Sequence, residues 1–274
     1  MAVTMADIQR LRKMTGAGMM DCKNALEESG SDFDKAIEII RKRGQAVAAK
    51  RSDRDASEGC VIAKNSGSFA ALIALKCETD FVAKNADFVA LTDEILDAAI
   101  KAKAKTQDDV KALPFGNITI QDAVTDRSGV TGEKMELDGY AVVEGPTTVT
   151  YIHPGNRLAT IVAFNQENVS SEVSHEIAMQ IAAMAPVAVN EDSVPAEFIA
   201  REKEIAADKA RQEGKPENLI ERIAEGRIAK YYKEVCLLKQ EYVKDPKKTV
   251  DEYLRGINKD LTVLAFSRFT LNQE

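Results

Sequence analysis

The sequence predicts an α+β protein with a small helical unit, a body of strands and helices, and a projecting pair of helices. Capped stretches with apolar residues at helical spacing fill the start of the chain. Strands and turns alternate with helices further on, and a charged helical stretch interrupts them. The predicted boundaries are 1–44 for the helical unit, 45–58 for a linker, 59–138 for a first core subdomain, 139–192 with 235–274 for a second core subdomain, and 193–234 for a helical hairpin.

Three short helices make up the first unit. Thr4 and Asp7 have the spacing of a capping box at the start of the first helix. The glycines of residues 15–18 separate this helix from the second. Asp32 is placed to cap the third helix, and Gly44 is placed to end it. We expect these helices to form a small orthogonal bundle.

Antiparallel strand pairs dominate the predicted body. The predicted strands are 60–64, 69–77, 135–143, 147–152, 158–164, 237–243 and 261–271, with a type II turn at 153–156. Helices are predicted near 88–104, 173–184 and 249–257, and Thr249 is placed to cap the last of them. Residues 106–134 mix short apolar pairs with turn residues, and no element is assigned to them. Because the strand, helix, strand order of 69–164 recurs at the end of the chain, we expect two related α+β subdomains with antiparallel sheets.

Residues 193–234 predict two antiparallel helices. Ser193 is placed to cap the first helix, Pro195 suits its first turn, and Gly214 turns the chain before the second. The first helix has few large apolar residues, so the pair could not bury a core of its own. We therefore expect a helical hairpin that projects from the body.

Composition argues against several classes of protein. A net charge of -7 is unsuited to direct nucleic-acid binding, which requires basic residues to displace counterions from phosphates. No apolar stretch approaches a membrane span, and residues 1–13 lack the apolar region of a signal peptide, so we expect a cytoplasmic protein without membrane contact. The four cysteines show no paired spacing, which predicts reduced core thiols rather than disulfides or a zinc site.

Groups for covalent chemistry are scarce. The two histidines, His153 and His175, offer few parts for a catalytic triad or a metal site. The glycine motif of residues 15–18 has no preceding strand and no following Gly-Lys-Ser/Thr, as a phosphate loop would. We expect no catalytic residue, metal or cofactor, and we expect that the chain is not an enzyme. An enzyme of unknown type is kept as a third alternative.

Asp80 and Phe81 stand where an apolar strand gives way to a helix. Such a corner is rigid because a sheet holds one side of it and a helix holds the other. The pair is either folded inward or presented to a partner as a stiff wedge. The pattern alone favours a buried Phe81 and an Asp80 that caps the helix.

Two segments of the chain resemble signatures of the bacterial elongation factor Ts family, the nucleotide-exchange factors of elongation factor Tu. One is TGAGMMDCKNAL at residues 15–26, and the other is CETDFVAKN at residues 77–85. Shorter matches at 177–179, 214–216 and 225–227 follow in the same order, so the resemblance covers nearly the whole chain. It implies a ubiquitin-associated-like three-helix N-terminal domain, a core of two α+β subdomains and a protruding antiparallel coiled-coil hairpin.

The resemblance also implies a mechanism. In this family the aspartate and phenylalanine of the second signature enter between two helices of the GTPase domain of elongation factor Tu. The matching residues are Asp80 and Phe81, with Thr79 and Val82 fixing the turn. Their entry disturbs the site of Mg²⁺, which is held by few protein ligands, and GDP then dissociates faster. Elongation factor Tu, in its GDP-bound and nucleotide-free forms, is the implied partner.

Two further contacts with elongation factor Tu are implied. A histidine-containing loop of the second core subdomain lies near the phosphate-binding loop of the GTPase, and His153 occupies the matching place. Pro154, directly after it, departs from the family pattern. Met19 and Met20 are the candidates in the N-terminal domain, and we expect one of them to be buried. The alternative function is a helical binding or assembly module without exchange activity, and a homodimer through the core or the hairpin stays open.

Overall fold

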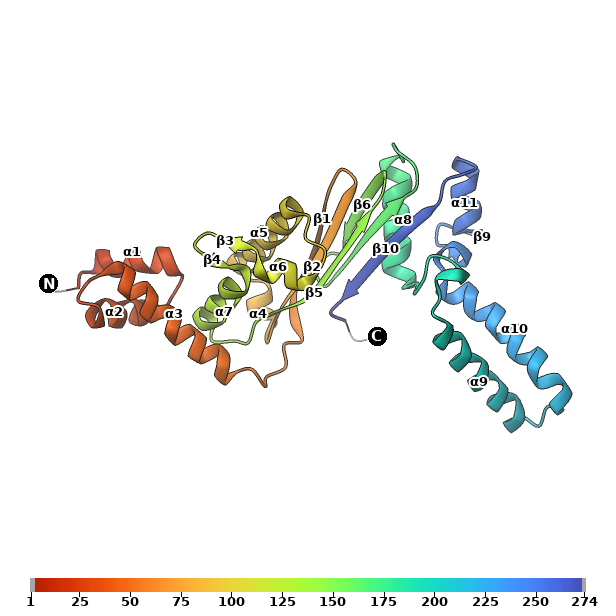
Figure 1. Ribbon diagram of the computed structural model, residues 1–274, viewed down its shortest axis with the longest axis horizontal. Helices are drawn as coiled ribbons and strands as arrows, with labels where there is room; N and C mark the ends of the chain where they lie inside the picture. Colours follow the sequence, from red (N-terminus) through yellow and green to blue (C-terminus); the bar gives the residue numbers. More distant parts are fainter. Residues whose placement is uncertain (1–2, 273–274) are drawn as a thin grey trace.

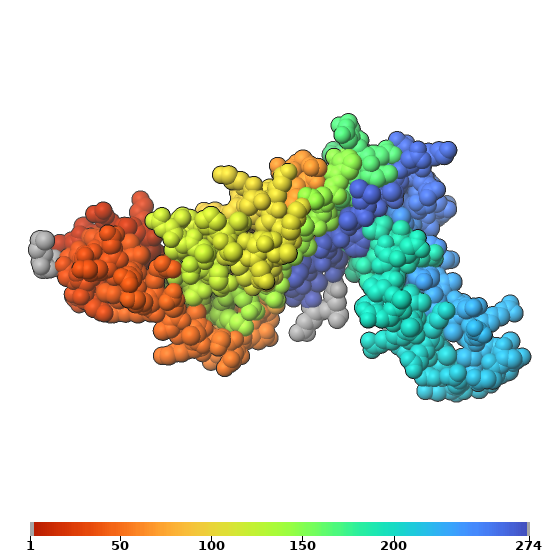
Figure 2. Space-filling model, in the orientation of Figure 1, coloured from red at the N-terminus to blue at the C-terminus, as the bar shows by residue number. Residues whose placement is uncertain are grey.

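The structure is a computed structural model that describes residues 3–272. It is elongated, with a helical unit at one end, two sheets and their helices in the middle, and a projecting pair of helices at the other end (Figure 1). The projecting pair stands clear of the body in the space-filling view (Figure 2). The mixture of helices and small antiparallel sheets confirms the α+β class. Among residues 3–272, none of the helices combines the length and the apolar character that a membrane crossing requires.

The N-terminal unit consists of α1 (Met5–Thr15), α2 (Met19–Glu28) and α3 (Phe33–Lys50). The capping box of Thr4 and Asp7 is present, and the Asp32 side chain accepts a hydrogen bond at the start of α3, as predicted. Gly16 ends α1 in the left-handed conformation, so residues 15–18 form a turn between helices. The buried core of the unit consists of Ile8, Leu11, Ala17, Cys22, Ala25, Leu26 and Ala36.

The sequence predicted that the third helix ends at Gly44, but the helix continues to Lys50. Gly44 is buried where α3 crosses α7 (Ile120–Thr131). A Cβ built on Gly129 of α7 would lie 2.1 Å from the Cα of Gly44, so the two backbones touch. The glycine therefore allows a close crossing of two helices instead of ending one. Residues 45–50 of the predicted linker are helical as a result.

The first sheet is antiparallel and consists of β1 (Glu58–Ser66), β2 (Phe69–Cys77) and β5 (Glu136–Glu144), with β2 in the centre. The single turn α4 (Asp80–Ala83) and the longer α5 (Ala86–Ala102) follow β2. The core under this sheet includes Phe88, Ile95 and Leu96 of α5. The domain boundary predicted at 138/139 falls inside β5, which pairs with β2 from Glu136 to Glu144, so this strand belongs with the first sheet.

The region without a predicted element contains α6 (Gln107–Ala112), the hairpin of β3 (Pro114–Phe115) and β4 (Ile118–Thr119), and α7. Capping boxes begin both helices, with Thr106 and Asp109 at α6 and Thr119 and Asp122 at α7. Periodicity did not reveal these elements because each is short and α7 buries the polar Ser128 beside apolar residues.

The second sheet is also antiparallel and consists of β6 (Thr147–Ile152), β7 (Leu158–Phe164) and β10 (Val263–Thr270), with β7 in the centre. The helices α8 (Ser171–Met184) and α11 (Val250–Ile257) pack on it, and Thr249 caps α11 as predicted. The two sheets pack against each other through mostly small residues, namely Val61, Ala63, Ala70, Leu72, Ala74, Val143, Ala159, Ile161 and Ala163.

The strand predicted at 237–243 is wrong as a single element. A 3₁₀ turn (Leu237–Lys239) begins the segment, and β8 (Glu241–Tyr242) follows and pairs with β9 (Asp245–Thr249). Leu237 is fully buried in the core of the second sheet. Apolar residues at both ends of such a short segment do not distinguish a strand from a buried turn.

The projecting helices are α9 (Ala196–Gln212) and α10 (Glu217–Val235), which lie side by side (Figure 1). Ser193 does not cap α9, because it ends a 3₁₀ turn (Glu191–Ser193) that the Asn190 side chain caps. Pro195 holds the N-cap position of α9 instead. The buried residues of the pair are Ala206, Ala210, Ile220, Ala224 and Ile228, which are too few and too small for an independent core.

Candidate functional site

The corner between β2 and α4 presents Phe81 to solvent. Its side chain is 84% exposed, whereas Val82 and Ala83 of the same turn pack against the core of the first sheet. Because α4 is a single helical turn, consecutive residues point in different directions, and the Phe81 ring is directed outward. The inward-folded alternative for Phe81 is therefore wrong.

Thr79, and not Asp80, is the N-cap of this turn. The hydroxyl oxygen of Thr79 accepts a hydrogen bond from the Val82 amide at 3.4 Å. Asp80 is the first helical residue, and its carboxylate accepts a hydrogen bond of 2.7 Å from the Lys84 ammonium one turn later. This bond with Lys84 lowers the pKa of Asp80. The exposed face of the corner thus combines an ionised carboxylate, a lysine and a large aromatic ring.

A distant segment holds the corner from behind. Glu133 lies in the loop between α7 and β5, and its carboxylate accepts hydrogen bonds from the Glu78 amide at 3.2 Å and the Thr79 amide at 3.0 Å. It also accepts a bond of 2.6 Å from the Thr79 hydroxyl. No sequence pattern pointed to Glu133, because this residue lies in the region to which no element was assigned. A carboxylate directly after Gly132, which ends α7, was the available signal.

His153 lies on an exposed turn between β6 and β7, and the Asn156 carbonyl of this turn accepts a hydrogen bond from the Val61 amide of β1 at 2.7 Å. The Asn156 amide donates to the His153 carbonyl at 3.0 Å, and Gly155 has a φ of 92°, as the predicted type II turn requires. The His153 Nδ1 atom is 2.8 Å from the Tyr151 hydroxyl. Tyr151 also contacts His175 edge to face, with ring centroids 5.5 Å apart. Both histidines of the chain thus flank one tyrosine.

The two methionines of the first signature differ in environment. Met19 packs against the core of the N-terminal unit, and Met20 is 64% exposed. Met19 is partly buried rather than fully buried. The sequence-predicted residues therefore form three separate groups, on the N-terminal unit, at the α4 corner and at the β6–β7 turn (Figure 1).

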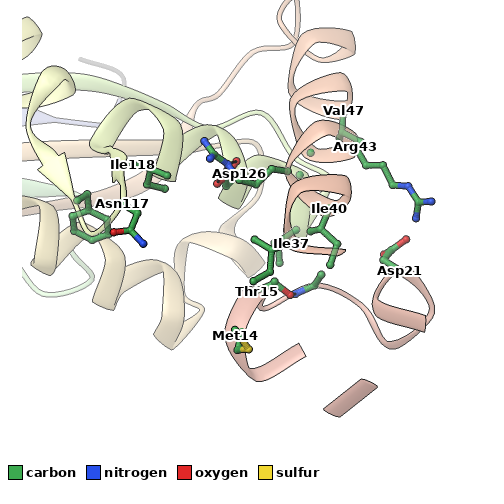
Figure 3. Close-up of a pocket in the computed structure, with 16 residues that line it drawn as sticks. Met14, Thr15, Asp21, Ile37, Ile40, Arg43, Val47, Asn117, Ile118 and Asp126 are labelled. Carbon is green, nitrogen blue, oxygen red and sulfur yellow. Dashed lines mark hydrogen bonds and ion pairs between the residues drawn. The ribbon is translucent and has the colours of Figure 1, made fainter. Parts of the chain in front are cut away.

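A cavity of about 530 Å³ lies between the N-terminal unit and the body, beside the crossing of α3 and α7. Thr15, Ile37 and Ile40 line one side of it, and Asn117 and Ile118 of the small hairpin line the other (Figure 3). Its lining is mainly apolar and includes Asp126, which Arg41 contacts through an N–O distance of 3.0 Å. Burial raises the pKa of Asp126, and Arg41 opposes that shift. The described residues that line the cavity include no histidine, cysteine or serine that could act as a nucleophile or base.

The described part of the chain holds no group of three or more His, Cys, Asp or Glu side chains that could bind a metal ion. The cysteines Cys22, Cys60, Cys77 and Cys236 are all buried and free, as small core residues. Burial raises the pKa of Cys60 to about 11 and that of Cys77 to about 12, so these thiols stay protonated near neutral pH.

Comparison with known proteins connects this geometry to a family. The family model described as Elongation factor TS matches residues 78–273 of the chain. Elongation factor Ts of Porphyromonas gingivalis is 58% identical over 275 residues, and the match covers 100% of both chains. The proteins of the same name from Parabacteroides distasonis and Azobacteroides pseudotrichonymphae are 53% identical over 331 residues and 52% identical over 274 residues, again with 100% of both chains covered. The chain belongs to the elongation factor Ts family.

Proposed function

We propose that the chain is a guanine nucleotide exchange factor of translation elongation that acts on elongation factor Tu. Family membership over the full length supports this function. The observation that carries it is the exposure of Phe81, 84% of whose side chain is accessible on a turn that is fixed by Thr79 and Glu133. Exposing a large apolar side chain to water is unfavourable, and inserting it into a partner removes that exposure, so Phe81 is suited to insertion.

In the proposed mechanism Phe81 enters between two helices of the GTPase domain, and Asp80 accompanies it. The shift of those helices displaces Mg²⁺ from the phosphates of GDP, because this cation tolerates little change in its coordination geometry. Loss of Mg²⁺ leaves the phosphate charge uncompensated, and GDP dissociates. By linkage, a factor that binds nucleotide-free elongation factor Tu more tightly than the GDP form weakens GDP binding by the same factor.

The proposed activity needs no covalent chemistry and no cofactor in this chain. Met20 and His153 are proposed as secondary contacts with elongation factor Tu, since both are exposed. Met19 would support Met20 from the core beneath it. We also assign a ubiquitin-associated-like fold to the N-terminal unit and an antiparallel coiled coil to the α9–α10 pair, on the strength of family membership.

The experiment is release of a fluorescent GDP analogue from the cognate elongation factor Tu, with and without this protein, at low and at excess Mg²⁺. A large acceleration that excess Mg²⁺ weakens would support exchange through the ion. No acceleration, with a folded protein and an active elongation factor Tu, would contradict the proposed function.

The alternative is a binding module that contacts a partner without releasing its nucleotide. The double variant Asp80→Ala/Phe81→Ala distinguishes the two functions. Exchange should fall steeply while binding through the N-terminal unit partly survives, as measured by titration calorimetry with elongation factor Tu. Unchanged exchange in a folded double variant would favour the binding module.

A further inference from the structure

Two carboxylates join the loop between α7 and β5 to the β2–α4 corner. One belongs to the loop and accepts hydrogen bonds from the corner, and the other belongs to the corner and accepts one from the loop. Glu133 of the loop accepts the Glu78 and Thr79 amides of the corner, at 3.2 and 3.0 Å. Glu78 of the corner accepts the Lys134 amide of the loop at 2.6 Å. Each segment therefore satisfies backbone donors of the other, which fixes the position of both backbones.

Both carboxylates are themselves held in place. Arg51, at the end of α3, donates from one Nη atom to the two Glu78 oxygens at 2.9 and 3.0 Å. The bond from the Lys134 amide, followed by the contact with Arg51, lowers the pKa of Glu78, so this carboxylate stays ionised. The buried Ser128 of α7 donates to the Glu133 carbonyl, and the Glu133 amide donates to Thr131. Neither carboxylate is free to turn away from the corner.

The arrangement acts on the first turn of α4. The Thr79 hydroxyl donates to Glu133 at 2.6 Å while its oxygen accepts from the Val82 amide, so the capping oxygen is oriented by Glu133. Thr79 precedes Asp80 and Phe81, and the direction of the exposed ring follows from the direction of this turn. Phe81 is 84% exposed, so packing contributes little to fixing the direction of its ring.

We propose that Glu133 is a positioning residue for Phe81, and that Glu78 completes the same clamp. Glu133 makes no contact with a partner in this scheme; it fixes the N-cap of α4 and thereby the direction in which the Phe81 ring projects. Its effect on nucleotide release rests on the exchange function proposed above. Its effect on the motion of the ring does not, and the two effects are measured separately.

The first measurement is local motion at position 81. The chain has no tryptophan, so the Phe81→Trp substitution introduces a single fluorescent reporter. In this background Glu133→Ala should increase the amplitude of fast motion in time-resolved anisotropy. Glu133→Gln should restore most of the rigidity, because its amide oxygen accepts the two amides and its NH₂ group donates to the Thr79 oxygen. Unchanged motion in Glu133→Ala would overturn the proposal.

The second measurement is GDP-analogue release from elongation factor Tu at saturating factor. Glu133→Ala should slow release at least about tenfold, because small displacements of a positioned group have effects of this size and the Phe81 ring would no longer be held in its direction. Glu133→Gln should recover most of this loss. Asp138→Ala is the matched control, since it removes a nearby exposed carboxylate whose partner is Lys76, and it should release GDP at the parent rate.

A double-variant cycle separates positioning from a general structural role. If Glu133 acts through the ring, Glu133→Ala should slow release no further in a Phe81→Ala background. If the double variant instead slowed release by the product of the two single-variant factors, the proposal would be overturned. If the parent protein does not accelerate GDP release at all, the proposed exchange function is wrong, and the anisotropy measurement still tests whether Glu133 positions Phe81. If the parent protein accelerates GDP release and Glu133→Ala leaves the anisotropy unchanged, the positioning role of Glu133 is wrong and the exchange function is supported.

Discussion

Glu133 in the first half of the core and Glu176 in the second each accept hydrogen bonds from distant segments, and the two carboxylates differ in what they hold. Glu133 beside the first sheet binds two backbone amides and a hydroxyl at the exposed corner. Glu176 beside the second sheet is buried and binds the side chains of Tyr242, Tyr253 and Lys244. The first carboxylate fixes a backbone that carries an exposed residue, whereas the second joins elements within the core.

The Glu176 site is dense and closed. The Tyr242 hydroxyl donates to Glu176 at 2.6 Å, and the rings of Tyr242 and Tyr253 stack with centroids 4.1 Å apart. Burial alone would raise the pKa of Glu176, but hydrogen bonds from Lys244 and the two tyrosines lower it to about 2. Since none of these residues forms an exposed wedge, we expect Glu176 to serve stability and Glu133 to serve exchange.

Removal of Glu176 is expected to have the largest effect. Glu176→Ala leaves the Tyr242 hydroxyl buried without an acceptor, and the free energy of unfolding should fall by about 3 kcal/mol in urea denaturation. Exchange by the folded fraction should be unchanged. Glu172→Ala, an exposed carboxylate one turn earlier in α8, is the control and should cost less than about 1 kcal/mol. An equal loss in both variants would contradict a specific role for Glu176.

The free energy of unfolding should also depend on pH through Glu176. The pKa of Glu176 is about 2 in the folded chain against an ordinary value of 4.5, so its stabilisation is present above about pH 4.5 and is lost as the pH falls toward 2. Between pH 5 and pH 3 the loss from this group should be about 2 kcal/mol. Glu176→Gln has no such titration, and the difference between the two pH profiles of unfolding isolates it. Parallel profiles would count against the lowered pKa.

A change at the corner should have a smaller effect on stability and a clearer one on exchange. Thr79→Val removes the hydroxyl that caps α4 and bonds Glu133, at a cost of about 1 kcal/mol in unfolding free energy. Release of GDP should slow severalfold because the turn carrying Phe81 loses its anchor. Thr79→Ser keeps the hydroxyl and should behave like the parent protein. If Thr79→Ser and Thr79→Val exchange equally, the cap has no part in positioning the ring.

The smallest effect is expected at the β6–β7 turn. His153 is exposed, and its side chain has a single hydrogen-bond partner among the described residues, Tyr151. His153→Ala should therefore change the unfolding free energy by no more than about 0.5 kcal/mol and slow GDP release by less than about threefold. A loss as large as that of Phe81→Ala would show that this turn is as important for exchange as the α4 corner.

Local signals in the sequence were sufficient for much of the fold. The capping residues Thr4, Asp32 and Thr249 act where the pattern placed them, because a cap depends on residues three positions away. The strands 147–152 and 158–164 agree with the structure for a similar reason, since each is a short run rich in β-branched or apolar residues beside a turn. The family signature at residues 77–85 located the corner and implied that Phe81 is presented to a partner, whereas the residue pattern alone favoured a buried ring.

Contacts between distant segments decided the rest. Glu133 and Thr79 are separated by 54 positions and meet because β5 pairs with β2, which no local pattern specifies. Gly44 has the local signal of a helix end, but the crossing with α7 makes it a buried contact point within a longer helix. Outside residues 106–134 and 237–243, the sequence by itself determined which segments become helices, strands and turns, because those preferences depend on near neighbours. The tertiary structure decided that Phe81 points outward and what holds it there, because both depend on the backbone hydrogen bonds and close contacts that form when distant elements pack together.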